Sequence, residues 1–398
     1  MLTASNRYRW VVLSVGVSAQ GAFSAYSQGL GSLGPVFQRH FGISLVQTGA
    51  LLTGVSIGTA LTLVAWGMLA DRLGERLVLA VGLAGGGLWL AAASLAPSYP
   101  VVLACLIAAG MFGACSISAS GRAVMGWFGT RERGMALGIR QMATPLGGGL
   151  AAAILPLVAL GYGLGAGLLT VAAGCLLAAL ASAIWIRTPP GPPGGTRDSG
   201  RHPLADRRIW RLAVGGSLLV GGQLSLVSYL VLFLSGHRGL PLQAAAAVLA
   251  AVQLGGAASR VLVGVWSDHR RGRLGLMRLI ALAGTATFAA VAGLADGPLV
   301  LLLPVLFLTG VISMSSNGLA FTATGEIAGL VRSATAMGFQ NTVLFVSGTV
   351  FPIAFGVAVT IAGWRLSFAA LAVLAGLGWL VLRPLERQEE AGWSATAA

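Results

Sequence analysis

The sequence predicts an all-α membrane protein in which about twelve transmembrane helices form two pseudo-symmetric six-helix bundles. Of its 398 residues, 56% are hydrophobic and only 9% are charged, whereas a soluble protein carries about 25% charged residues. Apolar stretches of roughly 20 residues, the length that crosses a bilayer, recur along the whole chain. The second half also repeats a pattern of the first, because Gly67 and Asp71 recur as Gly264 and Asp268 at the ends of apolar stretches.

One polar segment separates the apolar stretches into two sets. Residues 188–208 are rich in proline, glycine and charge and have no apolar face to bury, which is typical of a flexible linker. We therefore expect an N-terminal bundle at 1–187, whose first span covers 10–36, and a C-terminal bundle at 209–383. Residues 384–398 are expected to form a tail.

The arginines predict how the chain is oriented in the membrane. The net charge is +14 and the chain contains no lysine. Nearly all arginines lie in short segments between apolar stretches, so the charge does not indicate nucleic-acid binding. With a cytoplasmic N-terminus, only Arg39, Arg238 and Arg365 fall on the outer side, and the positive-inside rule then places both termini and the linker in the cytoplasm. We expect a monomeric, multi-pass protein of the cell (inner) membrane that contacts the lipid bilayer.

Two loops carry related motifs. Residues 67–76 read GMLADRLGER, and residues 264–273 read GVWSDHRRGR, a degraded copy with one extra residue. The first loop resembles the signature loop of the major facilitator superfamily, which joins the second and third helices of its members. The resemblance extends over the whole chain. It implies two six-helix bundles that move a solute across the membrane.

The chemistry of the first loop suggests a gating role. Gly67 lacks a side chain, so another helix can approach it closely. Asp71 lies at a helix end, where it can pair with an arginine or face the N-terminus of a neighbouring helix. Contacts of this kind can form in one conformation and break in another. The predicted gating residues are Gly67, Asp71, Arg72, Gly74, Arg76, Gly264, Asp268 and Arg271.

Three arginines fall inside predicted helices, where a charge is expensive and usually functional. Arg140 and Arg260 lie about 10 Å inside their helix ends, at about 1.5 Å per residue, whereas Arg122 is shallower. A guanidinium stays charged and presents donors that match a carboxylate. The alternative is that these arginines snorkel toward water or pair with structural partners. The pattern Arg260-x-x-x-Gly264 resembles the eighth-helix arginine of oxalate and monocarboxylate carriers in the superfamily, although their eleventh-helix basic residue is absent here.

These observations predict a carrier that moves a small organic anion, such as a carboxylate, by alternating access, with Arg140 and Arg260 as charge partners between the halves. The predicted substrate-binding residues, which include polar and aromatic mid-span positions, are Arg140, Arg260, Arg122, Tyr26, Gln223, Tyr229, Asn317, Gln340 and Asn341. The alternative is a proton-coupled drug or metabolite exporter of the same superfamily. Residues 144–149 read TPLGGG, which resembles the exporters' fifth-helix motif with threonine in place of its first glycine.

No residue pattern indicates an enzyme, a metal site or a cofactor. The four histidines fall in predicted loops, and the three cysteines lack metal-ligand spacing. Among the 11 acidic residues, only Glu326 falls near a predicted membrane interior. Proton-driven carriers commonly relay protons through buried acids or histidines. We therefore expect uniport, anion exchange, or symport in which proton and anion meet at the substrate.

Overall fold

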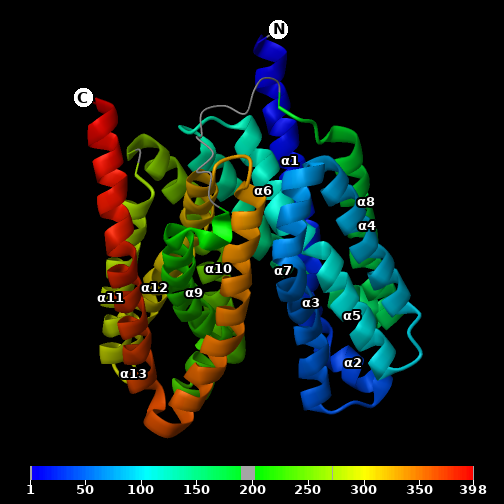
Figure 1. The fold of residues 1–398 in the computed structure, drawn as a ribbon. Helices are drawn as coiled ribbons and strands as arrows, with labels where there is room; N and C mark the ends of the chain where they lie inside the picture. The colour runs from blue at the N-terminus through cyan, green and yellow to red at the C-terminus, as the bar shows by residue number, and fades with distance from the viewer. Residues whose placement is uncertain (1, 190–201, 271, 398) are drawn as a thin grey trace. The chain divides into compact units, whose positions relative to one another are not determined.

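The computed structural model describes residues 2–189, 202–270 and 272–397, and these residues form helices without any strand. Most of the predicted linker, at 190–201, and the predicted gating residue Arg271 lie outside the described residues. Figure 1 shows the arrangement of the helices. The first helices are α1 (Leu2–Ser27), α2 (Gly34–Phe41), α3 (Leu45–Leu73), α4 (Glu75–Ser94), α5 (Tyr99–Gly113), α6 (Cys115–Trp127), α7 (Arg133–Tyr162) and α8 (Leu164–Trp185). They are followed by α9 (Arg207–Leu232), α10 (Leu242–Arg270), α11 (Leu274–Leu294), α12 (Leu299–Ala328) and α13 (Ser333–Ala397).

The helices have the length and composition of membrane spans. Within the described residues, 10 helical stretches are long and apolar enough to cross a membrane. One of them, Ser333–Leu385, contains Gly363 with a φ of 76°, where two helices meet at a kink. Helix α1 is not among the 10, although its 26 residues are enough to cross a bilayer. The predicted all-α membrane fold is therefore confirmed.

The first span differs in detail from the prediction of a single helix over 10–36. Helix α1 ends at Ser27, and a 3-10 turn at Gly29–Leu33 leads into the short helix α2. Pro35 lies in the first turn of α2. Proline lacks a backbone N–H, so it suits the start of a new helix better than the interior of a continuing one.

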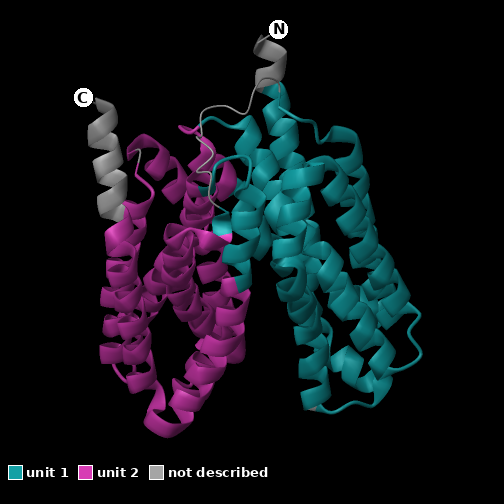
Figure 2. Ribbon diagram, in the orientation of Figure 1, with its two compact units in different colours: residues 1–129, 139–203, 328–342 teal, residues 130–138, 204–327, 343–398 magenta. Residues whose placement is uncertain are grey.

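The described chain divides into two compact units, coloured separately in Figure 2. Unit 1 comprises residues 1–129, 139–203 and 328–342, and unit 2 comprises residues 130–138, 204–327 and 343–398. Unit 1 therefore includes the first turns of α13, and unit 2 includes the first turns of α7. The bundles predicted at 1–187 and 209–383 follow chain order and stay a prediction.

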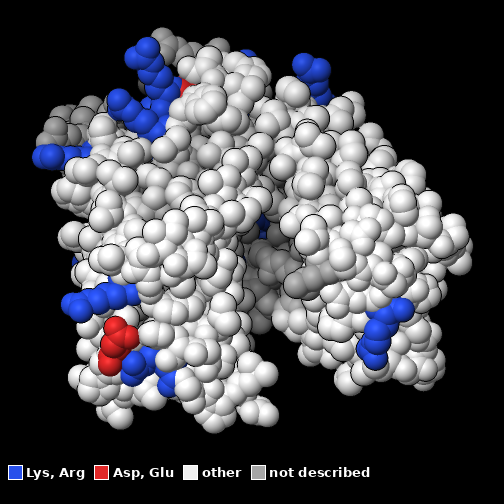
Figure 3. Space-filling model, turned by 90° about the horizontal axis from the view of Figure 1, so that it is seen from below, with Lys and Arg blue, Asp and Glu red and all other residues white. Residues whose placement is uncertain are grey.

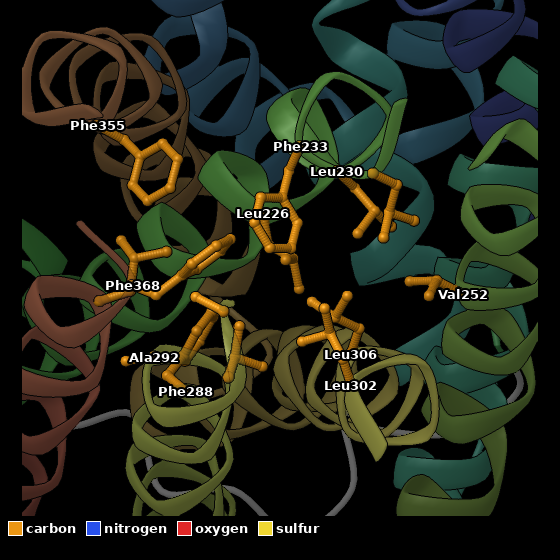
Figure 4. Packing of buried hydrophobic residues seen from close by; sticks show 14 of the residues in the cluster. Leu226, Leu230, Phe233, Val252, Phe288, Ala292, Leu302, Leu306, Phe355 and Phe368 are labelled. Carbon is orange, nitrogen blue, oxygen red and sulfur yellow. The ribbon is translucent and has the colours of Figure 1, made fainter. Parts of the chain in front are cut away.

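Each unit has an apolar interior. In unit 1, α3 and α5 pack closely at Gly58. A methyl group at Gly58 would overlap the Ile107 carbonyl oxygen, so the absence of a side chain allows this approach. In unit 2, side chains from α9 to α13 meet in one cluster, shown in Figure 4. The Phe233 and Phe368 rings in this cluster pack edge to face, with centroids 5.0 Å apart. These interiors fix the helices that carry the polar residues described below.

The outer surface is apolar. Large hydrophobic side chains such as Leu61, Leu150, Leu177 and Leu262 are exposed along the helices. Figure 3 views the molecule from below relative to Figure 1, onto one end of the helices, where scattered arginines stand among mostly uncharged side chains. Such exposure is unfavourable in water, whereas lipid tails are as apolar as leucine. The surface therefore suits a bilayer.

Candidate functional site

The carboxylate of Asp71, in the last turn of α3, caps the first turn of α13 within unit 1. Its oxygens accept hydrogen bonds from the Ala334 backbone N–H at 3.1 Å and the Thr335 backbone N–H at 2.9 Å. The Thr335 hydroxyl donates to the same carboxylate at 2.6 Å. The first N–H groups of a helix have no partner inside that helix, and the helix dipole favours negative charge there. Asp71 also lies 3.2 Å from Nε of Arg122, so it both pairs with an arginine and faces a helix N-terminus.

Glycine allows α3 and α13 to approach this closely. A methyl group at Gly67 would lie 2.5 Å from the Ala334 carbonyl oxygen. A methyl group at Gly338 would lie 2.5 Å from the Leu63 carbonyl oxygen. Because both obstacles are backbone atoms, neither could move aside without moving a helix. The close approach expected at Gly67 is thus made with the first turns of α13.

The same arrangement recurs in unit 2 between α10 and the first turns of α7. The Asp268 carboxylate accepts hydrogen bonds from the Gly134 N–H at 2.9 Å and the Met135 N–H at 2.7 Å. Gly264 packs directly against the Gly134 backbone, as Gly67 packs against Ala334. The sequence repeat therefore corresponds to a repeated contact, in which an aspartate at one helix end caps the start of another helix.

Arg273 adds an ion-pair network to the second cap. Its guanidinium lies 2.6 Å from Asp268 and 3.3 Å from Glu326, and it donates to the Thr130 carbonyl at 3.0 Å. Burial lowers the pKa of Arg273, but the carboxylates of Glu326 and Asp268 outweigh it, so the pKa is raised. Glu326, the acid singled out as a candidate for proton coupling, is therefore engaged by an arginine. The sequence prediction missed Arg273, although it stands within the motif copy.

The other residues of the first loop have local roles in the structure. Gly74 joins α3 to α4 with a φ of 84°, a conformation that glycine adopts without strain. The Arg76 Nε donates to the Ala183 carbonyl at 2.6 Å within unit 1. Arg72 is exposed. The geometry thus singles out Asp71 and Gly67 as the residues that hold another helix.

Arg122 belongs to the capping network. Besides Asp71, its guanidinium pairs with Glu75. It also donates to the carbonyls of Leu330 and Ala70 at 3.1 and 3.3 Å. Two carboxylates compensate its charge, so the structure gives Arg122 structural partners, and its role in solute binding stays a prediction.

Arg140, in α7, is completely buried inside unit 1. Its guanidinium donates to the Ser120 hydroxyl at 2.8 Å, to the Gln20 side-chain oxygen at 2.7 Å and to the Gln141 side-chain oxygen at 3.2 Å. It also donates to the backbone carbonyls of Ser116 and Ile117 at 3.0 and 2.6 Å. All five acceptors are electrically neutral. These five contacts orient the guanidinium inside the unit.

The sequence prediction named none of these partners, and Gln20 and Ser120 are the ones whose side chains link Arg140 to other helices. The Gln20 amide nitrogen also donates to the Thr144 hydroxyl at 3.2 Å. Both the oxygen and the nitrogen of this side chain therefore link α1 to α7. Gln20 is a polar residue in the middle of the first apolar stretch, and that position was a signal that could have found it.

Arg260, in α10, is 4% exposed and lies within unit 2. Its Nε donates to the Met314 carbonyl of α12 at 3.3 Å. One turn further along α12, the Asn317 amide nitrogen donates to the Gln223 side-chain oxygen of α9 at 3.1 Å. Arg260 therefore contacts α12 one turn before Asn317, and Asn317 in turn is hydrogen-bonded to Gln223, all within one unit.

The two predicted tyrosines pack inside their own units. The Tyr26 hydroxyl donates to the Ala109 carbonyl at 3.0 Å, and the side chain is fully buried. The Tyr229 ring lies 5.3 Å from the Phe355 ring and 6.4 Å from the Trp364 ring, measured between centroids. Both side chains thus have structural partners.

The predicted residues of α13 differ from each other. Gln340 is fully buried, and neither its Nε2 nor its Oε1 has a hydrogen-bond partner among residues 2–189, 202–270 and 272–397. Asn341 donates to the Met337 carbonyl of its own helix at 2.9 Å. Gln340 is therefore the more available of the two for an added water or solute. The same ranges contain no group of three or more histidine, cysteine or acidic side chains that could hold a metal ion.

Replacing Asp71 by asparagine is expected to destabilise the protein by about 1–2 kcal/mol, because the amide loses the charge that faces the α13 N-terminus. Thermal unfolding of the purified protein in detergent measures the effect. Asp296→Asn is the matched control, since Asp296 is 66% exposed in its pair with His237 and exposed ion pairs contribute about 0–1 kcal/mol. Equal changes in Tm for the two variants would contradict the capping role.

Comparison with known proteins agrees with this architecture. The Major Facilitator Superfamily model matches residues 15–352. Over 372 residues the chain is 35% identical to an uncharacterised MFS-type transporter of Mycobacterium tuberculosis, which covers 92% of this chain and 82% of that protein. A shorter match of 129 residues, at 30% identity, relates it to the hexuronate transporter of Bacillus subtilis and covers 32% of this chain and 30% of that protein.

Solved structures show the same fold at low sequence identity. The proton:xylose symporter superposes with a TM-score of 0.77 at 15% identity, over 97% of this chain and 99% of that chain. The fucose:proton symporter of E. coli gives a TM-score of 0.75 at 17% identity, over 93% and 97%. These likenesses show the fold, and the family model together with the 35% identical relative shows that the chain belongs to the Major Facilitator Superfamily of membrane transporters.

Proposed function

We propose that this transporter moves a small organic anion, such as a carboxylate, and that Arg140 and Arg260 supply the positive charge that recognises it. The observation that carries the proposal is the burial of Arg140 among neutral acceptors. A charge inside a membrane protein is expensive and usually functional, and the Arg140 guanidinium is held in place by hydrogen bonds to side chains of α1, α6 and α7. Arg122, by contrast, is compensated by Asp71 and Glu75.

An anion gains from this charge without touching it. Two opposite unit charges about 6 Å apart, at an effective dielectric constant of about 20, attract by about 3 kcal/mol. Such an attraction corresponds to a binding difference of about 100-fold. A completely buried Arg140 can therefore still attract the solute, because its charge raises the electrostatic potential at the place where the anion binds. Arg260, with the polar side chains of Asn317 and Gln223 near it, is the better candidate for a contact.

A relative supports the charge of the solute. The protein of Bacillus subtilis that matches 129 residues of this chain is named a hexuronate transporter. A hexuronate is a sugar acid, and its carboxylate is ionised at neutral pH. The match covers 32% of this chain, so it supports the class of solute and leaves the particular acid open.

We propose that transport follows alternating access and that the capped helix starts take part in it. Asp71 and Asp268 each hold the first turn of another helix through backbone N–H groups. Contacts of this kind bias a conformational equilibrium when they are present in one state and absent in another. The arginine distribution along the sequence further predicts that both termini face the cytoplasm.

A thermal-shift screen of the purified protein tests the solute class. Organic acids such as lactate, malate and glucuronate are expected to raise the Tm, because a ligand that binds the folded state stabilises it. Neutral sugars and cationic drugs are expected to have no such effect. Stabilisation by cationic drugs alone would instead favour the exporter alternative. Uptake of the stabilising acid into proteoliposomes then distinguishes transport from binding.

A further inference from the structure

Helix α12 accepts a hydrogen bond from Arg260 and carries a polar side chain, Asn317, one turn further along. The Met314 carbonyl, which accepts the hydrogen bond from Arg260 Nε, points along the helix axis toward residues 317 and 318. A methyl group at Gly318 would lie 3.8 Å from the Arg260 carbonyl oxygen, so α10 and α12 pack closely at this level. Asn317 is therefore on the part of α12 that Arg260 reaches.

The Asn317 amide is only half satisfied. Its Nδ2 donates to Gln223 Oε1 of α9 at 3.1 Å, which fixes the orientation of the amide. Its Oδ1 is buried and has no hydrogen-bond partner among the residues that the structure describes. Buried polar atoms are paired in the great majority of cases, and leaving an acceptor unpaired is costly. The amide is thus held with an unused acceptor.

The surroundings favour a donor that comes from outside the protein. Gln223 and Arg260 are buried, whereas Asn317 as a whole residue is partly exposed. A ligand that suits an unused acceptor near a buried cation has two features, a negative group for the guanidinium and an O–H donor for the amide oxygen. A simple carboxylate, which is ionised at neutral pH, supplies the first feature and lacks the second.

We propose that Asn317 Oδ1 accepts a hydrogen bond from a hydroxyl group of the transported anion, so that the cargo is a hydroxylated carboxylate. This inference rests on the proposed function, because it assigns the carboxylate to Arg260. The hydroxyl lies close to the carboxylate in the solute, since Arg260 contacts α12 at Met314, three residues before Asn317. Gln223 acts as a positioning residue: it accepts a hydrogen bond from the Asn317 amide nitrogen, so the Asn317 amide oxygen faces away from Gln223.

Matched pairs of acids test the proposal on the purified full-length protein. Binding of lactate is compared with propionate, and malate with succinate, by isothermal titration calorimetry. Glucuronate is compared with glucose to isolate the carboxylate. We expect the hydroxylated acid of each pair to bind at least about 10-fold tighter, since a site built to hydrogen-bond a hydroxyl rejects an analogue that lacks it. Glucose is expected not to bind.

Variants of α12 assign the preference to one residue. Asn317→Leu is expected to remove the preference for the hydroxylated acid while the acids still bind. Thr322→Val is the matched control in the same helix, because the Thr322 hydroxyl donates to the Gly318 carbonyl of its own helix at 2.8 Å, and the preference should be unchanged. Asn317→Ser provides a second, smaller and polar substitution should the leucine variant fail to fold.

The outcomes separate the two proposals. Equal binding of lactate and propionate, and of malate and succinate, by the wild-type protein would overturn the hydroxyl inference and leave the anion proposal standing. That result is expected if a bound water satisfies Asn317 Oδ1. A preference that persists in Asn317→Leu would overturn the role of Asn317. Binding of glucose without binding of any acid would overturn the proposed function itself.

Discussion

Replacing Arg140 by glutamine is expected to lower the affinity for an anionic solute by about 100-fold, which corresponds to the loss of about 3 kcal/mol of attraction at about 6 Å. Glutamine removes the charge but keeps hydrogen-bonding groups for Ser120 and Gln20, the partners that surround the guanidinium. Arg140→Lys should retain much of the affinity, because it keeps the charge. Uptake into proteoliposomes and ligand titration measure the effect, and size-exclusion chromatography checks insertion and folding.

Arg122→Gln is the control for the loss of any arginine from a helix. The charge of Arg122 is compensated by the carboxylates of Asp71 and Glu75. The Arg122→Gln variant should therefore lose stability, while its preference for acids over neutral solutes stays unchanged. Arg260→Gln should behave like Arg140→Gln. Wild-type uptake of the anion by the Arg140→Gln, Arg260→Gln double variant would rule out the role of both charges.

Replacing Gly67 by valine is expected to reduce transport by at least about 10-fold, because the new side chain would overlap the backbone of α13. The nearest atoms, in Ala334 and Thr335, lie 2.5 to 2.8 Å from the position of an added methyl group. Overpacking of this kind costs about 1–3 kcal/mol, and here it acts on the capped contact between α3 and α13. Initial rates of uptake, normalised to inserted protein, measure the change.

Gly49 supplies a matched control in the same helix. A methyl group at Gly49 would have no atom within 4 Å, so Gly49→Val should transport at a rate within about 2-fold of the wild type, since surface substitutions cost little. If Gly67→Val and Gly49→Val transported equally well, the close approach at Gly67 would have no part in the transport cycle.

The sequence predicted the fold class because the signals for it are local. Each apolar stretch is long enough to cross a bilayer by itself, and a membrane helix satisfies its backbone hydrogen bonds within the segment. The repeated glycine and aspartate at helix ends also reported a structural repeat. The break after Ser27 was missed, although the glycines before Pro35 indicate a new helix start there.

The site was predicted less completely, and Arg122 shows why. Its depth in a predicted helix made it a candidate for solute binding, yet its partners Asp71 and Glu75 lie 51 and 47 residues away in the sequence. Arg140 has the same sequence signature but donates to the neutral side chains of Ser120 and Gln20. The sequence showed that both arginines lie within helices, but it could not show which side chains would pair with each guanidinium.

The sequence by itself determined that this protein is helical, lies in a membrane and carries arginines and an aspartate motif at defined depths. Only the tertiary structure decided which groups these side chains meet: that Asp71 caps a helix more than 260 residues away, and that Arg260 donates to the backbone of α12 one turn before Asn317, whose buried oxygen has no hydrogen-bond partner among the described residues. The physical reason is range. Hydrophobicity sums over a whole segment, whereas a hydrogen bond is made or lost within about 3 Å, and helical periodicity identifies a face but not the helix that packs against it.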